Sequence, residues 1–597
     1  MERAREERGS QIPVVLMALL AALLVFCALR MQYAGILPFS YAFSDIFLFT
    51  GLYLWFYWRA GRNKISSYRG YVLPALFAVF MLLGASYRSL GNWDQCFGSG
   101  LNFIKSAVAF TGYVILFRSI LQEVFILLES LNTLQDGRSS LLQWLFGSKC
   151  FFRVYCIIFL MWLPFILASY PGGSCVDVSY QIKEVLGEVP FSTQQPLVHT
   201  LLVGGCVKLG YLLFHSYNAG LFFYILLQSF VFAGILAYSV ETLRKRKVSN
   251  HFLAVCMAIY GIVPMYANFA SMAIKDTLFT AFVLLYVVFM AEFLWEFQME
   301  GQLSVRSGAG MAIAALSAML FRNNGIYVVL TGMAALMVFL WKQRRKVCTT
   351  AVRKMIFAGT LCLTFSLYAF ISAGLSRMLH AENVGSREML SLPLQQTARY
   401  AMLYGEETTD EERQAIEAVL GDYGSLGETY NPDISDPVKS RFSSEASSEE
   451  LAAYFKAWAA QFFKHPDTYV QAVFHGAYGW FYPGVNNSVR YEGLLPIFHR
   501  PVLLAGIERR LNGWYDFWDS LPLLGLLENA GFYTWSLFVF IAFAHRKGEG
   551  KGLLLSMPAC ISLLICIASP AFFLHIRYAF PIMFIMPFLF GTLCVKE

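Results

Sequence analysis

Asp177 is the residue of this chain best placed to act as a general base. It lies in a short polar stretch, SYPGGSCVDVSYQIK, that directly follows a long apolar run. An acidic residue just beyond a membrane helix can meet both a lipid headgroup and a polar acceptor, and partial desolvation raises the basicity of its carboxylate. We therefore expect Asp177 to take a proton from an acceptor hydroxyl. The alternative is that Asp177 caps a helix that starts near Val178, the usual role of an aspartate after glycines.

Arginines at the ends of apolar runs are candidates for binding an anion. Arg322 precedes Asn323 at the end of one run, and Arg577 lies in FLHIRYAFP before the last run. Fixed cations of this kind would stabilise an anion near the membrane surface, such as a departing phosphate. Arg399, in LPLQQTARY, is a third candidate. The alternative for each is an arginine that only snorkels to lipid headgroups, and for Arg399 we favour that alternative.

A second charged pair, Lys275 and Asp276, stands at another predicted turn between apolar runs. An ion pair or a helix N-cap at a membrane boundary would also explain both residues. The nine histidines lack a metal-ligand spacing such as HExxH, so we expect no metal site, and His199 is interpreted as a hydrogen-bonded interfacial residue. No phosphate-binding glycine motif is present, so no nucleotide-binding site is expected.

The composition places these residues on a polytopic membrane protein. Hydrophobic residues make up 57% and charged residues 14% of the 597, whereas soluble domains carry about 25% charged residues. About fourteen apolar blocks are long enough to cross a hydrocarbon core, which needs roughly 20 residues. They lie near 13–30, 41–58, 71–90, 101–118, 151–169, 219–240, 251–270, 276–297, 308–321, 326–341, 355–374, 526–544, 553–572 and 577–594. The predicted fold class is therefore an all-α transmembrane bundle.

Clusters of lysine and arginine predict the orientation, because such clusters stay on the cytoplasmic side. The net charge of +7 comes from short clusters between apolar blocks, so no nucleic-acid partner is expected. The clusters fall at 59–64, 244–247, 342–346 and 546–551. All four clusters reach the cytoplasm only if the segment 197–214 does not cross the membrane. We expect this segment, which follows Pro196, to lie in the membrane interface. Both termini are then inside, and the segment 375–525 is outside.

Four regions follow from this threading: N-terminal helices at 1–150, a membrane core at 151–374 with an outer loop at 170–215, an extracytoplasmic insert at 375–525, and C-terminal helices at 526–597. The insert, expected to be helical or irregular, is too long for a connector. The outer loops contain Cys96 and Cys175, which could pair, although two isolated thiols are the expected state.

Two segments of the insert have distinct patterns. Ser447 or Ser448, followed by Glu450, predicts the start of a helix. His465 and Pro466 predict its end. The next stretch, 468–484, is aromatic and nearly apolar, and we expect it to lie against the outer membrane surface.

The order of these features resembles the GT-C superfamily of multi-spanning glycosyltransferases, which use lipid-phosphate sugars and include protein O-mannosyltransferases and bacterial aminoarabinose transferases. The resemblance covers roughly 151–345 and 575–581. In those enzymes a catalytic acid follows the first core helix, and a His-Pro-Pro-like segment then opens an interfacial helix. This chain has Asp177, followed by Gln-Gln-Pro at 194–196 and by His199. The departure from His-Pro-Pro bears on the acceptor pocket more than on the fold.

The same resemblance implies a set of site residues. A second acidic residue at the next outer turn is typical of the group, and here Lys275 and Asp276 occupy that place. An RYxxP-like end, here Arg577, Tyr578 and Pro581, also recurs. The implied catalytic residues are Asp177 and Asp276. The implied substrate-binding residues are His199, Lys275, Arg322, Asn323, Arg399, Arg577 and Tyr578.

The function that the resemblance implies is sugar transfer at the outer face of a bacterial plasma membrane. The donor is a polyprenyl-phosphate-linked sugar, the acceptor is a cell-envelope glycan, lipid or protein, and the other partners are membrane lipids. No cofactor is expected, since the lipid-phosphate sugar is a substrate. An inverting reaction with Asp177 as general base is the expected mechanism. The alternative is a transporter or flippase for a lipid-linked glycan or envelope polymer, which would show internal repeats and interrupted helices with polar groups at mid-membrane depth.

Overall fold

The computed structural model describes residues 2–32, 42–60, 70–131, 139–301, 303–343, 351–383, 387–485, 496–568 and 575–595. Within these ranges the protein is almost wholly helical, with a single two-stranded sheet. Nine of the described helices are long and apolar enough to cross a membrane, or ten if the bent pair α11 and α12 forms one span. The fold is therefore an all-α, multi-pass membrane bundle. The larger number of about fourteen spans stays a prediction.

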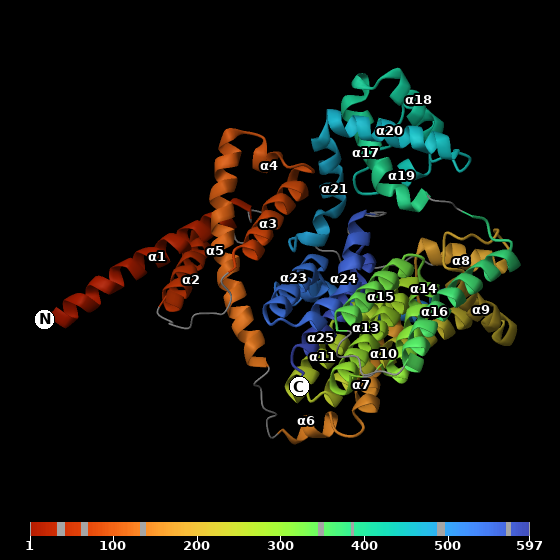
Figure 1. Cartoon of the computed structure of the whole chain (residues 1–597), viewed down its shortest axis with the longest axis horizontal. Helices are drawn as coiled ribbons and strands as arrows, with labels where there is room; N and C mark the ends of the chain where they lie inside the picture. The colour runs from red at the N-terminus through yellow and green to blue at the C-terminus, as the bar shows by residue number, and fades with distance from the viewer. Residues whose placement is uncertain are drawn as a thin grey trace.

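The N-terminal helices form a group of their own, drawn in red to orange in Figure 1. They are α1 (Glu2–Gln32), α2 (Ala42–Ala60), α3 (Val72–Leu90), α4 (Asp94–Phe97) and α5 (Gly100–Leu131), and α6 (Ser140–Leu145) follows. Gly112 of α5 lies directly on the backbone of Leu24 in α1, so the two helices cross in close contact. The Phe77 ring of α3 stacks on Trp535 with 4.2 Å between centroids, which joins this group to the rest of the protein.

The next elements form the central bundle, in which α13 (Lys275–Glu300) is the most buried of the candidate membrane spans. Its elements are α7 (Cys150–Ala168), β1 (Gly173–Ser174), α8 (Val176–Leu186), α9 (Leu197–Phe214), α10 (Tyr217–Lys245), α11 (Asn250–Ile262), α12 (Pro264–Ala270), β2 (Met272–Ala273), α13 (Lys275–Glu300), α14 (Val305–Phe321), α15 (Gly325–Lys342) and α16 (Ala351–Met378). Serines cap several of these helices, as Ser216 does by accepting from the Ala219 N–H. Helix α9 is long and apolar enough to span, so its interfacial position stays a prediction.

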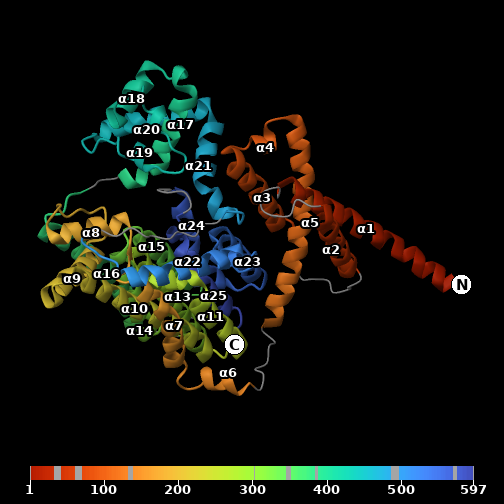
Figure 2. The same ribbon diagram turned by 180° about the vertical axis from the view of Figure 1, so that it is seen from behind.

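A compact unit with its own core follows α16; we call residues 387–464 the cap unit. Its elements are η2 (Arg387–Leu390), α17 (Ser391–Tyr404), η3 (Gly405–Glu407), α18 (Asp410–Leu420), η4 (Gly427–Thr429), α19 (Asp436–Lys439) and α20 (Ser448–Lys464). Leu394, Ile416 and Tyr454 are among the buried residues of its core. Both views show the cap unit at one end of the bundle (Figure 1, Figure 2).

Helix α21 (Pro466–Phe481) connects the cap unit to the bundle. The helix predicted before it is confirmed: Ser447 and Glu450 form a capping box, and His465 is the C-cap. Most of α21 is buried, and it packs on α3, α23 and α24. The aromatic stretch at 468–484 therefore packs largely against protein, and the part of the predicted insert with its own core is narrower than 375–525.

The last elements complete the bundle. They are α22 (Val502–Ser520), η5 (Gly525–Glu528), α23 (Ala530–Arg546), α24 (Gly550–Ala568), η6 (Ile576–Ala579) and α25 (Phe580–Thr592). Nearly every residue of α25 is buried, and Tyr260 of α11 donates to the backbone of Phe584 (3.4 Å). Helix α25 thus lies at the centre of the bundle, against α10, α11 and α13.

The two ends of the bundle differ in charge. Helices α10, α15 and α23 end in Lys245, Lys342 and Arg546, at the end of the bundle remote from β1 and β2. Of the predicted cytoplasmic clusters, residues 62, 64 and 344–346 lie outside the described ranges. The described basic residues of the last three clusters therefore share one end, as the predicted threading requires.

Candidate functional site

The short parallel sheet brings two distant loops into register. Gly173 pairs with Met272 and Ser174 with Ala273, and Gln228 of α10 donates to the Met272 carbonyl oxygen (2.6 Å), which fixes the second loop. Helices α8 and α13 start directly after the two strands. Asp177 lies in the first turn of α8, and Asp276 lies in the first turn of α13. The sheet therefore brings the first turns of these two helices to the same end of the bundle.

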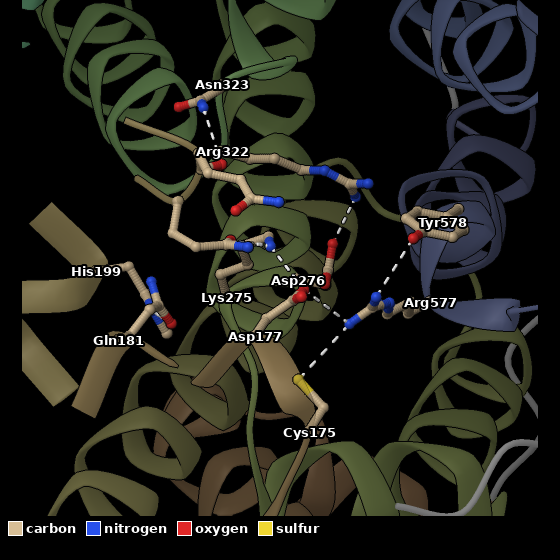
Figure 3. Close-up of polar contacts among 12 residues, drawn as sticks. Cys175, Asp177, Gln181, His199, Lys275, Asp276, Arg322, Asn323, Arg577 and Tyr578 are labelled. Carbon is tan, nitrogen blue, oxygen red and sulfur yellow. Dashed lines mark hydrogen bonds and ion pairs between the residues drawn. The ribbon is translucent and has the colours of Figure 1, made fainter. Parts of the chain in front are cut away.

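Asp177 is held by two cations from other parts of the chain. Lys275 Nζ lies 2.9 Å from Asp177 Oδ2, and Arg577 lies 3.2 Å from the same oxygen (Figure 3). Lys275 also donates to the side-chain oxygen of Gln195. Arg577 further contacts the Cys175 sulfur at 3.6 Å and the Tyr578 hydroxyl at 3.3 Å. The start of α8, the start of α13 and the segment before α25 thus meet at one carboxylate.

The electrostatics keep Asp177 ionised. Burial by itself raises the pKa of the Asp177 carboxyl, but Lys275 and Arg577 more than offset that effect and hold the pKa well below its ordinary value. Its side chain is still 28% exposed, so a ligand can reach it. The carboxylate is therefore available as an acceptor, although its cations reduce its basicity.

Arg322 and Asp276 form the second ion pair of the site. Arg322 NH1 lies 2.6 Å from Asp276 Oδ1, and the Asp276 side chain is only 1% exposed. The guanidinium also lies over the rings of Phe279 and Tyr578, at 5.3 and 5.2 Å from the centroids. Asn323 donates to the Thr193 carbonyl oxygen (3.1 Å). Asp276 therefore holds Arg322 in position through this buried ion pair.

A cavity of about 380 Å³ lies in front of these residues. On the bundle side it is lined by Asp177, Lys275, Arg322, Asn323, Arg577 and Tyr578, together with 194–196. The site contains three cations and the two carboxylates of Asp177 and Asp276, so its formal charge is +1 (3 − 2). The cations are Lys275, Arg322 and Arg577. Phe279, Val328 and Ile565 form an apolar part of the wall. The cavity thus combines a cationic region with an apolar one.

Two predicted site residues lie elsewhere. His199 is fully buried between Gln181 (3.0 Å) and the Tyr224 hydroxyl (2.8 Å), so it joins α8, α9 and α10. Arg399 lies in the cap unit, where it donates to Tyr430 (3.2 Å). Neither residue lines the cavity. Their roles in the structure are therefore to connect elements within the protein.

Several cavity residues were not predicted from the sequence, and four of them lie outside the central bundle. Met389, Asp436 and Lys439 come from the cap unit, and Trp480 comes from α21. No motif marks them, because the chain segments that carry them are more than 100 residues from Asp276 and their position depends on how the cap unit docks. An aromatic run around Trp480 was the one visible signal.

The structure also shows the surroundings of the cysteines and of the other residues that could bind a metal ion. No group of three or more histidine, cysteine, aspartate or glutamate side chains suited to a metal ion occurs among the described residues. Cys96 and Cys175 are both buried, free thiols. Cys96 donates to the Leu82 carbonyl oxygen (3.6 Å), and Cys175 lies beside Arg577.

Fold and site together define a multi-pass helical membrane protein with a charged cavity at one end of its bundle. The chain belongs to the DUF6020 family, a family of unknown function, whose model matches residues 186–597. No curated protein and no solved structure matches the chain. The matched region contains Lys275, Asp276, Arg322 and Arg577 and begins nine residues after Asp177 (186 − 177).

Proposed function

We propose that this protein is a membrane glycosyltransferase that moves a sugar from a polyprenyl-phosphate donor to an acceptor on the outer face of a bacterial plasma membrane. The observation that carries the proposal is the convergence of Asp177 with Lys275, Arg322 and Arg577 on one cavity at the ends of apolar helices. Such a place suits a substrate whose charged headgroup emerges from the lipid.

The cavity has the properties that a lipid-phosphate donor requires. Its volume of about 380 Å³ falls in the usual range for small-ligand sites. Arginine binds phosphate oxygens through two parallel hydrogen bonds, so Arg322 and Arg577 are suited to the headgroup. The apolar wall of Phe279, Val328 and Ile565 would receive the first prenyl units.

The proposed reaction is a direct displacement at the anomeric carbon. The acceptor hydroxyl oxygen forms the new bond to that carbon while the bond from the carbon to the phosphate oxygen breaks. The bonding pair leaves with polyprenyl phosphate, whose charge Arg322 and Arg577 stabilise. The hydroxyl proton passes to the Asp177 carboxylate. A single displacement of this kind inverts the anomeric configuration.

The ion pairs of Asp177 fit this sequence of events. Lys275 and Arg577 both contact Asp177 Oδ2. A donor phosphate competes for the same cations, and each contact that shifts to the phosphate raises the basicity of Asp177. Donor binding would therefore prepare the base for the acceptor.

The alternative function, a flippase or transporter, has one feature in its favour. Helices α11 and α12 meet at a bend of 53°, and interrupted helices are common in transporters. However, the charged residues of the cavity belong to helix ends and the loops beside them. That position favours chemistry at a surface over passage through the bilayer.

The decisive experiment is a transfer assay with purified protein and a panel of radiolabelled polyprenyl-phosphate sugars. A bacterial cell-envelope fraction supplies the acceptor. We expect one labelled sugar to move to the acceptor with release of polyprenyl phosphate, and Arg577→Gln to abolish the transfer. If the protein instead moves intact labelled lipid across vesicle membranes without cleaving it, the flippase function replaces the transferase.

A further inference from the structure

The cavity is shared between the bundle and the cap unit. Asp436 and Lys439 of α19 and Met389 of η2 line it from the cap unit, and Trp480 lines it from the connecting helix α21. The phosphate-binding candidates Arg322 and Arg577 line it from the bundle. A ligand that fills the cavity therefore touches both parts of the protein.

Trp480 carries an unused hydrogen-bond donor. The residue is 2% exposed, and its indole Nε1 is buried with no hydrogen-bond partner among the described residues. Buried donors are nearly always hydrogen-bonded, so an unsatisfied donor on a residue that lines a cavity points to an acceptor supplied by a ligand. The indole also provides a flat apolar face.

Asp436 and Lys439 add a fixed acceptor and donor. The Lys439 side chain is only 4% exposed, and its Nζ lies 2.7 Å from Asp436 Oδ1. The Asp436 side chain is 49% exposed and has room for further hydrogen bonds. A carboxylate and an ammonium held together in this way can bind two adjacent hydroxyl groups. The carboxylate accepts a hydrogen bond from one hydroxyl, and the ammonium donates a hydrogen bond to the other.

We propose that Trp480, Asp436 and Lys439 bind the sugar ring of the lipid-linked donor, so that the cap unit determines which sugar is transferred. This inference rests on the proposed function. A sugar attached to a phosphate at Arg322 and Arg577 would lie within the same small cavity as Trp480, Asp436 and Lys439. The sugar ring can form the kinds of contact that these three side chains offer. Its apolar ring face packs on an indole, and its hydroxyls both donate and accept hydrogen bonds.

The test measures binding of two kinds of probe to purified full-length protein. One probe is bare polyprenyl phosphate, and the others are polyprenyl phosphates loaded with a pentose, a hexose or an amino sugar. We expect one sugar-loaded lipid to bind wild type more tightly than the bare lipid. Trp480→Phe and Asp436→Asn should each reduce that preference about tenfold, the effect of one lost hydrogen bond to the sugar, without weakening the binding of the bare lipid.

Trp518→Phe is the matched control. The Trp518 indole N–H is likewise buried without a partner among the described residues, but Trp518 does not line the cavity. The preference should therefore survive in Trp518→Phe. The inference is overturned if the Trp480 and Asp436 variants keep the preference, or if no sugar-loaded lipid binds better than bare lipid. Failure of the proposed function itself gives a different result, because then Arg322→Gln and Arg577→Gln bind bare polyprenyl phosphate as wild type does.

Discussion

Lys275 and Arg577 both contact the same carboxylate oxygen of Asp177. Replacing Asp177 should therefore affect catalysis and donor binding in different ways. Asp177→Asn removes the proposed proton acceptor, so we expect transfer to fall by about 10² to 10⁴. The same change raises the formal charge of the cavity by one, and affinity for polyprenyl phosphate should stay the same or increase. Turnover and lipid binding measured on one preparation test both expectations.

Asp410→Asn is the charge-matched control for this experiment. Asp410 is an exposed residue at the start of α18 in the cap unit, away from the cavity. Turnover of Asp410→Asn should equal that of wild type. Near-normal turnover in Asp177→Asn would remove Asp177 from the mechanism.

Arg322 and Asp276 call for a double substitution, because either single change leaves a buried charge without its partner. Arg322→Gln should lower the free energy of unfolding by about 3 to 5 kcal/mol. Asp276→Asn combined with Arg322→Gln should recover much of that loss, since both charges are gone. Binding of polyprenyl phosphate should stay weak in the double variant. Thermal unfolding in detergent and lipid binding are the two measurements.

Arg322→Lys separates a phosphate-binding arginine from one that only supports the fold. Lysine keeps the charge but loses the planar fork, so its affinity for polyprenyl phosphate should lie between those of wild type and Arg322→Gln. Recovery of full binding in the double variant would show that Arg322 serves the fold alone.

Much of the candidate site could be predicted from residue type and position. Asp177, Lys275, Arg322 and Arg577 all stand at the ends of apolar runs, and the structure brings them to one cavity. His199 stands in a similar position but turns inward to Tyr224. The sequence could not distinguish the two cases, because the direction of a side chain depends on how its helix packs.

At the scale of elements, the loop before β1 depends on Gly172. This glycine has a φ of +128°, and a Cβ atom there would lie 2.6 Å from Ile225 Cγ1. Gly172→Ala should therefore displace β1, misplace Asp177 and lower the free energy of unfolding by about 1 to 3 kcal/mol beyond the backbone strain. Transfer activity and thermal unfolding would both report the change.

Gly187→Ala is the matched control for that prediction. Gly187 ends α8 with a φ of +81°, but nothing lies within 4 Å of the position of an added Cβ. The control therefore carries backbone strain without a clash, and it should be the milder of the two variants. Equal stability of both alanine variants would mean that β1 adapts without displacing Asp177.

Glu184 anchors the loop that follows α8, and it makes the stability of the protein depend on pH. Its Oε1 accepts from the Ser192 N–H (3.1 Å), and burial raises the pKa of its carboxyl to about 7 from an ordinary value of 4.5. Between these two pKa values, Glu184 is therefore protonated in the folded protein and ionised in the unfolded chain. Between about pH 4.5 and 7 the free energy of unfolding should fall as pH rises.

Glu184→Gln tests this pH dependence, because the amide does not titrate. The melting temperature of wild type in detergent should decline between pH 5 and 7.5, and the decline should be smaller in Glu184→Gln. Glu188→Gln changes an exposed carboxyl two residues beyond the same helix and should keep the wild-type slope. Parallel slopes in wild type and Glu184→Gln would assign the effect to other groups.

The elements themselves were predictable where local signals are strong. The capping box of Ser447 and Glu450 marked the start of α20 from sequence alone. The path of α21 was not predictable, since an aromatic, nearly apolar stretch suits a membrane surface and a protein interior equally well. Contacts with α3, α23 and α24, all distant in sequence, decide the outcome.

At the scale of the whole molecule, the N-terminal helices support the position of α21. Phe80 of α3 stacks on Phe481 with 4.6 Å between centroids, and His475 of α21 bridges the Gly91 carbonyl oxygen (3.1 Å) and Asp433 of the cap unit (3.3 Å). The family match begins only at residue 186, after these helices. The cap unit is thus held from two sides, by the bundle and by the N-terminal group.

The arrangement of charge predicts which end of the bundle faces the cytoplasm. Lys245, Lys342 and Arg546 end three helices at the end remote from the cavity, and lysine and arginine clusters remain in the cytoplasm. We therefore expect the cavity and the cap unit to face outward, where a lipid-linked sugar would be transferred. Because α9 passes the length and hydropathy criteria for a span, the threading needs a direct test.

Single cysteines introduced at Glu428 and Lys547 provide that test. Both positions are exposed, the first in the cap unit and the second just after α23. A membrane-impermeant maleimide applied to intact cells should label Glu428→Cys above the wild-type background, and Lys547→Cys only after permeabilisation. The wild-type background is needed because Cys362 is exposed. Labelling of Lys547→Cys but not Glu428→Cys in intact cells would place the cavity in the cytoplasm and leave Asp177 without access to acceptors on the outer face.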